Sequence, residues 1–348
     1  MDLSNVAVVI LNYNTKKYLA SFLPLVIKYS GNARVVVVDN HSKDGSAALV
    51  ASEFPQVTLI QLHENLGFCG GYNTALQQVK ADYFVLLNSD VEVTENWLIP
   101  MISLMKSSPK VAACQPKIKC YHQKDQYEYA GGAGGFIDYL GYPFSRGRLF
   151  ETLETDQGQY DDEVEVFWAT GACMCINSTL YQQFGGLDER FFAHMEEIDL
   201  CWRLKNAGYK ILFTPHSQVY HIGGGTLNKT SPRKTFYNFR NGLFLLLKNL
   251  PANQLHRIFW RLVLDGIAGA RFLLLGEFKN TWAIFRAHIS FYLHFREMYT
   301  ERKNSPKQSS FPEIYKRSLV KDYFLLGKRT FKELAFNSSL KKSDYKEF

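Results

Sequence analysis

The chain has 348 residues, of which 46% are hydrophobic and 15% are aromatic. This composition excludes an intrinsically disordered protein, because such proteins combine few apolar residues with a high net charge. The length allows one large domain, or one domain with an appendage, since single cores rarely grow beyond about 250–300 residues.

The net charge of +7 is unevenly distributed along the chain. Up to Gly225 there are 17 Lys and Arg against 24 Asp and Glu, and after it there are 23 against 9. An acidic first part suits a catalytic body whose carboxylates bind a metal ion. A basic, aromatic second part suits an anionic surface, either lipid headgroups or nucleic acid.

Cysteine spacing and hydropathy indicate the compartment. No pair of the six cysteines has C-x-x-C spacing, so we expect reduced thiols in a cytoplasmic protein. The first residues lack the basic region of a signal peptide, so none is expected. No stretch of about 18 uncharged apolar residues predicts a transmembrane helix.

Short β-branched runs alternate with helical spacing in the first part of the chain. We expect strands at Val6–Leu11, Val35–Val38, Val57–Leu62 and Tyr83–Leu87, and helices at Tyr18–Tyr29 and Gly71–Val79. This alternation predicts βαβ units with a parallel sheet. In such sheets ligands bind at the carboxyl ends of the strands.

Polar residues gather where these strands end. They are Asn12-Tyr13, Asp39-Asn40, the stretch from Asn65 to Asn73, and Asn88-Ser89-Asp90. Asn and Asp also punctuate turns, which would explain any single group. Four successive strand ends favour a binding site.

The middle of the chain is less regular. From Lys119 to Glu165 a Gly- and Tyr-rich stretch predicts a long loop or a β-ribbon over the site, and such loops are usually functional or mobile. Regular structure is expected again at Val166–Ile176, in a helix over Glu196–Ala207, and in strands at Lys210–Phe213 and Val219–Ile222.

Eight sequence blocks follow one another between Val6 and about Gly225. They are V-A-V-V-I-L-N-Y-N, V-V-V-V-D-N-H-S-K-D-G-S, N-L-G-F-C-G-G-Y-N, L-L-N-S-D, T-G-A-C, F-G-G-L-D-E, M-E-E-I-D-L-C-W-R and H-I-G-G-G-T. In this order they resemble family 2 glycosyltransferases, and bacterial polysaccharide- and rhamnosyltransferase-like members in particular. The resemblance implies an α/β GT-A fold over residues 1–225, with a mixed sheet flanked by helices.

The resemblance assigns the donor-binding residues. It implies that Tyr13 and Asp39 hold the nucleobase, since a ring can stack on it and a carboxylate can accept from its imide N–H. A core tyrosine and a helix-capping aspartate are the alternatives. Asn65, Gly71 and Asn73 correspond to the block that lines the donor site, where small residues allow a phosphate or ribose to approach.

The family's metal motif is Asp-x-Asp, and this chain has Asn88-Ser89-Asp90. The resemblance implies that Asp90 binds Mg²⁺ or Mn²⁺ and that His221 is a second ligand. Asn88 would instead hydrogen-bond the ribose or a phosphate. A turn or cap at Asp90 and a structural role for His221 are the alternatives.

The family's catalytic base is the second residue of a Glu-Asp pair, which here is Glu196-Glu197. The resemblance therefore implies that Glu197 accepts the acceptor's hydroxyl proton. Its additional methylene moves the carboxylate by about an ångström, which matters for placement in catalysis. Asp199 and Arg203 are expected to form a helix ion pair.

Other polar and aromatic residues could contact the sugars. Glu196 and Asp188 are candidates for contact with the acceptor. Trp168 and Trp202 could stack on sugar faces, with core packing favoured for Trp202. The donor sugar would depend on loop shapes around Gly131–Phe150.

After Gly225 the sequence predicts helices over Tyr237–Leu250 and Gln254 to Phe295. Arg257, Arg261, Asp265 and Arg271 fall on one helix face and the rest is largely apolar. This pattern predicts membrane-surface helices in region 226–300, near a lipid-linked acceptor. Packing on the catalytic domain or on a second subunit is the alternative. Residues 301–348 are expected as a basic tail that meets headgroups or is solvated.

These patterns predict an inverting, metal-dependent glycosyltransferase that uses a UDP- or dTDP-sugar. Its acceptor would be a polysaccharide or a lipid-linked sugar, and the enzyme would lie on the inner face of the cell membrane. No motif supports nucleic-acid binding, and a homo-oligomer is compatible with the sequence. The alternative is an inactive relative that binds nucleotide sugars or acts as a scaffold, motivated by Asn88 and by glutamate at position 197.

Overall fold

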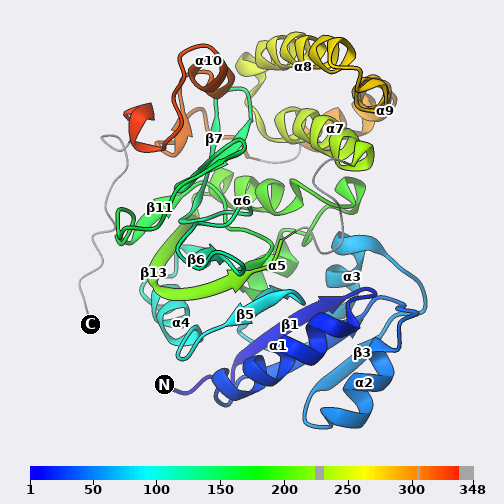
Figure 1. Ribbon diagram of the computed structural model, residues 1–348, viewed down its shortest axis with the longest axis vertical. Helices are drawn as coiled ribbons and strands as arrows, with labels where there is room; N and C mark the ends of the chain where they lie inside the picture. The colour runs from blue at the N-terminus through cyan, green and yellow to red at the C-terminus, as the bar shows by residue number, and fades with distance from the viewer. Residues whose placement is uncertain (224–230, 304–305, 337–348) are drawn as a thin grey trace.

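The computed structural model describes residues 1–223, 231–303 and 306–336. A nine-stranded mixed sheet lies at its centre, in the order β11-β13-β6-β12-β4-β1-β2-β3, with β5 paired to β13 (Figure 1). The strands are β1 (Val6–Asn12), β2 (Arg34–Asp39), β3 (Thr58–Gln61), β4 (Tyr83–Asn88), β5 (Val91–Val93), β6 (Val111–Cys120), β11 (Val164–Val166), β12 (Cys173–Asn177) and β13 (Lys210–His221).

The four strands at one end of the sheet, β4, β1, β2 and β3, are parallel to one another, which confirms the predicted βαβ units. β1 and β2 are almost completely buried, as expected for Val- and Ile-rich strands covered on both faces. The register pairs Asn12 with Asp39 and Leu11 with Asn88. The polar strand ends predicted from the sequence therefore lie side by side.

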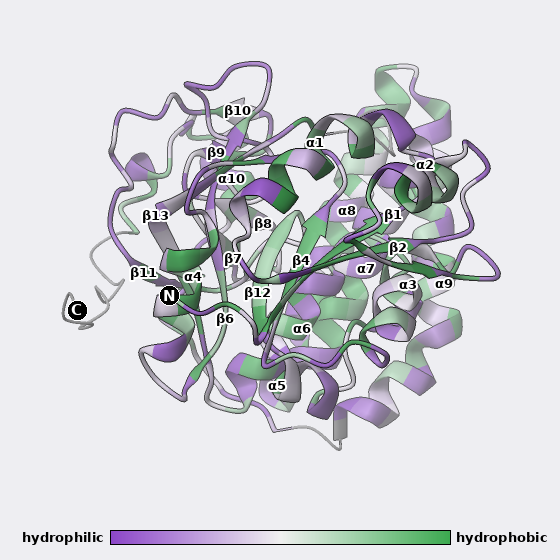
Figure 2. Cartoon of the chain, turned by 90° about the horizontal axis from the view of Figure 1, so that it is seen from below, coloured by the Kyte–Doolittle hydropathy of each residue, from purple (hydrophilic) through white to green (hydrophobic). Residues whose placement is uncertain are grey.

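Helices cover both faces of the sheet. α1 (Lys16–Tyr29), α2 (Ser46–Glu53) and α4 (Leu98–Lys106) pack on one face. α3 (Gly67–Leu76), α5 (Ser178–Gln183) and α6 (Glu196–Asn206) pack on the other. In Figure 2 the central strands are mainly hydrophobic, whereas the connecting loops are largely hydrophilic. The result is an α/β fold in three layers.

Two boundaries differ from the prediction. Lys210–Phe213 and Val219–Ile222 belong to one strand, β13, which pairs with β6 across a register shift between Thr214 and Gln218. The expected element Val166–Ile176 is interrupted, because β11 ends at Val166 and β12 begins at Cys173. The residues between them form a turn next to the site.

A second, five-stranded sheet replaces the loop or ribbon expected between Lys119 and Glu165. Its order is β10-β9-β8-β7-β14. Its strands are β7 (Gly135–Asp138), β8 (Pro143–Ser145), β9 (Arg148–Leu149), β10 (Thr152–Leu153) and β14 (Ile314–Tyr315). Because β14 pairs with β7, this sheet joins two distant parts of the sequence.

The described part of the expected basic tail is folded and packed. Besides β14 it contains α10 (Leu319–Phe324), and Phe331 and Phe336 are buried against Phe136. The aromatic residues between the basic ones explain why residues 306–336 pack on the protein instead of remaining solvated. Lys341-Lys342 lies outside the described residues.

Three helices follow the sheet: α7 (Pro232–Asn249), α8 (His256–Leu274) and α9 (Phe278–Lys303). α7 is buried against α6 and α9, and α9 buries Ala283, Ala287, Phe291 and Met298. None of the helices in the described ranges combines the length and the apolar character needed to cross a bilayer. The domain boundary predicted at residue 225 lies outside the described residues and stays a prediction.

The polar face predicted for α8 turns toward the protein. Arg261 and Asp265 are buried and form an ion pair of 2.8 Å, while Phe259, Trp260 and Ile267 are exposed. Arg261 and Asp265 thus anchor α8 within the protein, whereas Arg271 and many of the apolar residues are exposed.

Candidate active site

The end of β2 carries Asp39, which is buried among polar groups. The Asn12 side-chain amide donates to one of its carboxylate oxygens at 3.0 Å, and the Ser42 backbone N–H donates to the other at 3.0 Å. A carboxylate has room for further donors, because its two oxygens offer about four lone-pair sites. Asp39 is therefore held in a fixed position and can still accept from a ligand.

Tyr13, directly after β1, is exposed. Among the described residues before Phe259, Met1 and Tyr13 are the exposed large hydrophobic side chains. Apolar side chains of the catalytic part are otherwise covered, so an uncovered ring beside Asp39 is unusual here. It is suited to stacking on a planar ligand.

Asn65 and Gly71 have structural explanations. Asn65 accepts from Asn40 at 3.0 Å and from the Gly67 N–H at 2.9 Å, and so fixes the turn before α3. A Cβ on Gly71 would lie 2.8 Å from Leu11 Cδ1. The glycine is thus needed for α3 to pack on β1, whether or not a ligand also approaches it.

Asn73 is not brought to the strand ends. Its amide donates to the Leu187 carbonyl at 2.7 Å and its oxygen accepts from the Leu187 N–H at 3.0 Å. The Tyr181 hydroxyl also donates to it at 2.7 Å. Asn73 therefore fastens α3 to the turn before Asp188.

The Asn88-Ser89-Asp90 segment lies on the turn between β4 and β5. The Asn88 backbone N–H donates to the Ala172 carbonyl at 3.0 Å, and the Ser89 hydroxyl lies 2.8 Å from that of Thr15. Asp90 is buried, with Oδ1 3.2 Å from His221 Nε2. The structure thus brings the two predicted metal ligands into contact.

A third acidic group, Glu128, completes this cluster and was missed in the sequence. Its Oε2 lies 3.2 Å from Nδ1 of His221, on the ring nitrogen opposite Asp90. Burial opposes protonation of His221, but Glu128 and Asp90 outweigh it and raise the pKa of His221 to about 10. Burial likewise raises the pKa of each carboxyl, yet His221 holds both below their ordinary values.

The three groups do not surround a common point. Within the described ranges, no group of three or more His, Cys, Asp or Glu side chains is arranged to hold a metal ion. Asp90 and His221 Nε2 offer one oxygen and one nitrogen, so other ligands would have to come from substrate phosphates and water. The rest of the H-I-G-G-G-T block, from Gly224, lies outside the described residues.

Glu196 and Glu197 begin α6 and carry little solvent contact. Burial raises the pKa of Glu197, although interactions with the backbone N–H groups of Gly171 and Ile198 oppose this. Burial and the neighbouring Glu197 raise the pKa of Glu196 well above its ordinary value. Neighbouring carboxyl groups divide in this way into one acid and one base. Burial thus favours the neutral form of Glu196 more strongly than that of Glu197.

One turn connects Glu197 with the Asn88 loop. In Thr170-Gly171-Ala172, the Gly171 N–H helps to lower the pKa of Glu197, and the Ala172 carbonyl accepts from the Asn88 N–H. A Cβ on Gly171 would be 4.0 Å from Glu197 Cβ and 3.3 Å from Phe68. The turn that interrupts the element expected at 166–176 therefore lies between Glu197 and the end of β4.

The chain before α6 adopts an unfavourable conformation. Phe192, His194 and Met195 have φ of 64°, 69° and 74°, in the left-handed region. Such residues cost on the order of 1–3 kcal/mol each and persist only where other contacts hold them. These three positions precede Glu196 and Glu197 directly.

Asn241 of α7 supplies those contacts. Its amide donates at 3.0, 2.9 and 2.7 Å to the carbonyl oxygens of Phe191, Ala193 and His194. The neighbouring Arg240 donates to the Phe191 carbonyl at 3.0 Å. Asn241 is completely buried. Its role was not predicted, because a single asparagine in a helix carries no signal of a contact 47 residues away.

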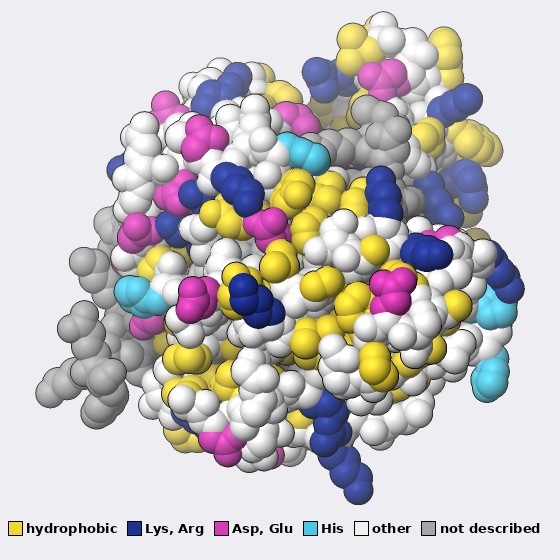
Figure 3. All heavy atoms as spheres, turned by 60° about the horizontal axis from the view of Figure 1, so that its bottom comes forward, with side chains coloured by type: hydrophobic (Ala, Val, Ile, Leu, Met, Phe, Trp, Pro, Cys, Tyr) yellow, Lys and Arg dark blue, Asp and Glu magenta, His cyan; other side chains and the backbone are white. Residues whose placement is uncertain are grey.

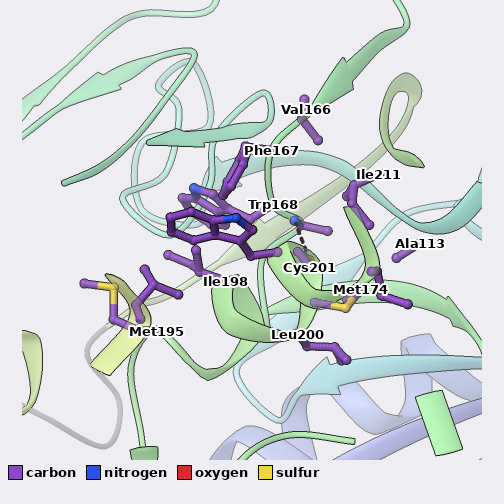
Figure 4. Packing of buried hydrophobic residues seen from close by; sticks show 14 of the residues in the cluster. Ala113, Val166, Phe167, Trp168, Met174, Met195, Ile198, Leu200, Cys201 and Ile211 are labelled. Atoms are coloured by element: carbon purple, nitrogen blue, oxygen red, sulfur yellow. Dashed lines mark hydrogen bonds between the residues drawn. The ribbon is translucent and has the colours of Figure 1, made fainter. Parts of the chain in front are cut away.

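Several expected sugar contacts are used inside the protein. Trp168 is buried, donates from Nε1 to the Phe136 carbonyl at 2.9 Å, and packs among Phe167, Ile198 and Cys201 (Figure 4). It therefore does not present its ring for stacking, because the second sheet covers it. Trp202 is buried as expected.

The acidic residues Asp188 and Asp199 form ion pairs. Asp199 pairs with Arg203 at 2.8 Å, as predicted, and also with Lys248 at 2.9 Å. Asp188, a candidate for acceptor contact, instead binds Arg190 and Lys248. Asp188, Arg190, Arg203 and Lys248 line a cleft of about 620 Å³ between α6, α7 and α9, separate from the strand ends. Its charges are largely paired with each other, so we do not assign the donor to it.

Comparisons with known proteins agree with this arrangement. A family model described as glycosyl transferase family 2 matches residues 7–171. One relative is the N-acetylglucosaminyl-diphospho-decaprenol L-rhamnosyltransferase of Mycobacterium tuberculosis, 26% identical over 233 residues, covering 62% of this chain and 75% of the relative. Residues 7–171 thus belong to glycosyltransferase family 2. Another relative of this family 2 glycosyltransferase is a low-salt glycan biosynthesis hexosyltransferase of Haloferax volcanii, 25% identical over 216 residues, covering 60% of this chain and 64% of that one.

Solved structures show the fold of this family 2 glycosyltransferase to be GT-A, as expected. GalNAc-T7 with UDP, GalNAc and Mn²⁺ has a TM-score of 0.56 at 16% identity, over 72% of this chain and 49% of that one. The mannosyltransferase PcManGT of Pyrobaculum calidifontis, with GDP-Man and Mn²⁺, has a TM-score of 0.51 at 15% identity, over 86% and 84%. At these identities the likeness concerns the fold alone.

Proposed function

We propose that this glycosyltransferase moves a sugar from a UDP- or dTDP-sugar to a hydroxyl group of a carbohydrate or lipid-linked acceptor, with inversion at the anomeric carbon. The observation that carries the proposal is the Thr170–Ala172 turn, which has the Asn88 loop on one side and Glu197 on the other. The strand end proposed to bind the donor and the proposed base, half-buried Glu197, thus contact one short segment.

The donor's base would bind between Tyr13 and Asp39. The exposed ring of Tyr13 offers a stacking surface, and the fixed carboxylate of Asp39 accepts from an imide N–H, which uracil and thymine both carry. Asn88, half-buried at the end of β4, is placed to hydrogen-bond a ribose or phosphate. Asn65, Gly71 and Asn73 would support this site through α3.

Asp90 and His221 fit a divalent cation. Their buried oxygen and imidazole nitrogen are 3.2 Å apart, and Nδ1 on the other side of the ring lies 3.2 Å from Glu128 Oε2, so the proton of a neutral ring can stay on Nδ1. Such a donor set suits Mn²⁺ and is acceptable for Mg²⁺. The ion, when bound, would neutralise charge that develops on the leaving diphosphate.

Glu197 would act as the general base. Its raised pKa makes it a better proton acceptor than an ordinary glutamate, and Glu196 takes up the proton that two adjacent carboxyl groups cannot both lose. As the acceptor oxygen attacks the anomeric carbon, its proton passes to Glu197 and the bond to the diphosphate breaks. A single displacement of this kind inverts the configuration.

We further propose that α8, α9 and the end of α10 rest on an anionic membrane. The exposed large hydrophobic side chains after residue 258 all lie in this part, and they are Phe259, Trp260, Val263, Ile267, Leu273, Leu274, Leu275, Phe278, Trp282, Phe285, Ile289, Tyr292, Leu293, Phe295, Phe324, Leu325 and Leu326. A soluble surface rarely exposes so large an apolar patch. The patch suits helices that lie in the plane of a lipid interface.

Charge favours lipid over a second protein copy as the occupant. Exposed basic residues lie among the apolar ones, namely Arg271, Lys279, Arg286, Arg296, Lys321 and Arg329. In Figure 3 hydrophobic and basic side chains adjoin on the far helices, which Figure 1 identifies as α8 and α9. Two copies of this face would bring like charges together, whereas anionic headgroups would neutralise them.

A screen of nucleotide sugars tests the enzymatic proposal. The purified chain with Mn²⁺ or Mg²⁺ should release nucleotide from a UDP- or dTDP-sugar in the presence of an acceptor, and the product should have inverted configuration. The inactive relative proposed as the alternative would bind a nucleotide in calorimetry without turnover. That result, obtained with a broad donor and acceptor panel, would reject the proposed function.

A further inference from the structure

His221 lies beside a second carboxylate, that of Glu128, which the predicted metal site does not require. The imidazole is buried between two carboxylates, with Asp90 3.2 Å from Nε2 and Glu128 3.2 Å from Nδ1. The exposed fractions of the three residues are 8% for Asp90, 5% for Glu128 and 6% for His221. Burying a carboxylate costs free energy unless it has a partner, so the burial of Glu128 beside His221 needs an explanation.

Backbone contacts hold Glu128 in this position beside His221. The Glu128 N–H donates to the Ile118 carbonyl of β6 at 3.1 Å, and the Ala130 N–H donates to its Oε2 at 2.5 Å. Gly223 has a φ of 70°, and a Cβ at this position would lie 2.6 Å from Glu128 Oε1. The chain just after His221 therefore makes room for this carboxylate.

The geometry divides the two carboxylates by function. Asp90 faces the nitrogen that the proposed ion would use, and Glu128 faces the other nitrogen, on the far side of the ring. A histidine that binds metal through one nitrogen commonly donates from the other to a carboxylate, which fixes its tautomer and raises its basicity. Glu128 has this position.

We infer that Glu128 is a positioning residue of the metal site, which accepts the Nδ1–H of His221 and so presents Nε2 beside Asp90. Its carboxylate also compensates for the negative charge that is missing where Asn88 replaces the first aspartate of the Asp-x-Asp motif. With an ion on Nε2 the imidazole would be neutral, and Asp90 and Glu128 would carry two negative charges around it, which matches a divalent ion. This inference rests on the proposed metal-dependent function.

Binding of Mn²⁺ itself tests the inference without an activity assay. Isothermal titration of Mn²⁺ into the full chain, with and without UDP, should show binding about 10–100-fold weaker in Glu128→Gln and Glu128→Ala than in the wild type. Glu151→Gln, a change at an exposed glutamate, should bind Mn²⁺ like the wild type. Thermal unfolding of each variant checks that the fold is retained.

A second readout keeps the test independent of folding. With Mg²⁺ bound, ¹⁵N NMR should show the Nδ1–H tautomer of His221 in the wild type and a weakened or mixed tautomer in Glu128→Gln. Folded variants that bind Mn²⁺ like the wild type and keep that tautomer would overturn this inference alone. A wild-type chain that binds no Mn²⁺, even with UDP, would overturn the metal site and the inference together.

Discussion

The two parts of this molecule treat their apolar side chains in opposite ways. Up to His221 the described large hydrophobic side chains are buried or half-buried except Met1 and Tyr13, and polar groups converge on the strand ends. In α8 the charged Arg261 and Asp265 are buried, while aromatic and aliphatic residues face outward. The difference indicates that the first part buries its large apolar side chains around a polar site. The second part presents an apolar surface that a membrane or another partner would cover.

The first part should depend on Asp90 more than on any neighbouring acid. Asp90→Ala removes one of two protein ligands of the proposed cation, and we expect kcat/KM to fall at least about 10³-fold. Glu92→Ala, two residues away on β5, serves as the matched control and should change kcat/KM little. Substantial activity in a folded Asp90→Ala protein would show that the strand-end site is assigned incorrectly.

The attachment of α8 should depend on its buried ion pair. Arg261→Met leaves Asp265 buried without its nearest cation, so the free energy of unfolding should decrease by about 3–5 kcal/mol. Chemical denaturation of wild type and variant measures this directly. A change below about 1 kcal/mol would mean that α8 is held by apolar contacts and that the contrast between the two parts is weaker than described.

The two parts meet at Asn241, which reaches from α7 to the strained chain before Glu196. Asn241→Ala removes the three hydrogen bonds that hold this segment, so we expect kcat to decrease about 10–100-fold while donor binding is retained. Asn241→Asp is a useful companion, because it keeps the shape and removes the donor. Equal losses in kcat and in donor affinity would point to general unfolding instead of misplaced Glu197.

Membrane binding should depend on the exposed face of α8 and α9. Leu274→Ser combined with Trp282→Ser should reduce flotation with vesicles that contain phosphatidylserine by about tenfold or more, since each side chain loses apolar area to bury. Ala270→Ser with Thr300→Ser changes exposed positions on the same helices without removing large apolar groups. If both double variants float like the wild type, the patch has another occupant, such as a second copy, which light scattering would show.

The smallest expected effect is a shift in pH dependence. Activity requires the ionised form of Glu197, whose pKa lies above the ordinary value of 4.5, so kcat/KM should fall with acidification already above that pH. Glu196→Gln should leave this acid limb in place, because burial already favours the neutral form of Glu196. A limb at or below pH 4.5 would argue against a buried base.

The sequence predicted the candidate site best where its residues lie at the ends of neighbouring strands. The runs ending at Asn12, Asp39 and Asn88 predicted parallel strands, and their order in the sheet brings those ends together. The i,i+4 spacing of Asp199 and Arg203 likewise predicted a local ion pair that the structure confirms. Both depend on short-range patterns that a strand or helix converts directly into proximity.

Contacts between distant segments could not be predicted in this way. Glu128 approaches His221, and Asn241 approaches His194, only after the second sheet and α7 have packed. Trp168 is covered for the same reason, since the segment that shields it was expected as a loop or a β-ribbon, without a prediction of the side chains it would cover. The helical spacing of α8 defined its two faces, but which face meets the protein depends on partners such as Tyr142, which hydrogen-bonds Asp265 at 3.1 Å.

The measurement that tests the central claim most directly compares turnover with binding in Glu197→Gln. The account predicts that this variant binds the donor nucleotide like the wild type in calorimetry, while nucleotide-sugar turnover falls about 10²–10⁴-fold. Unchanged turnover in Glu197→Gln, at unchanged donor affinity, would contradict the assignment of the base and with it the proposed mechanism.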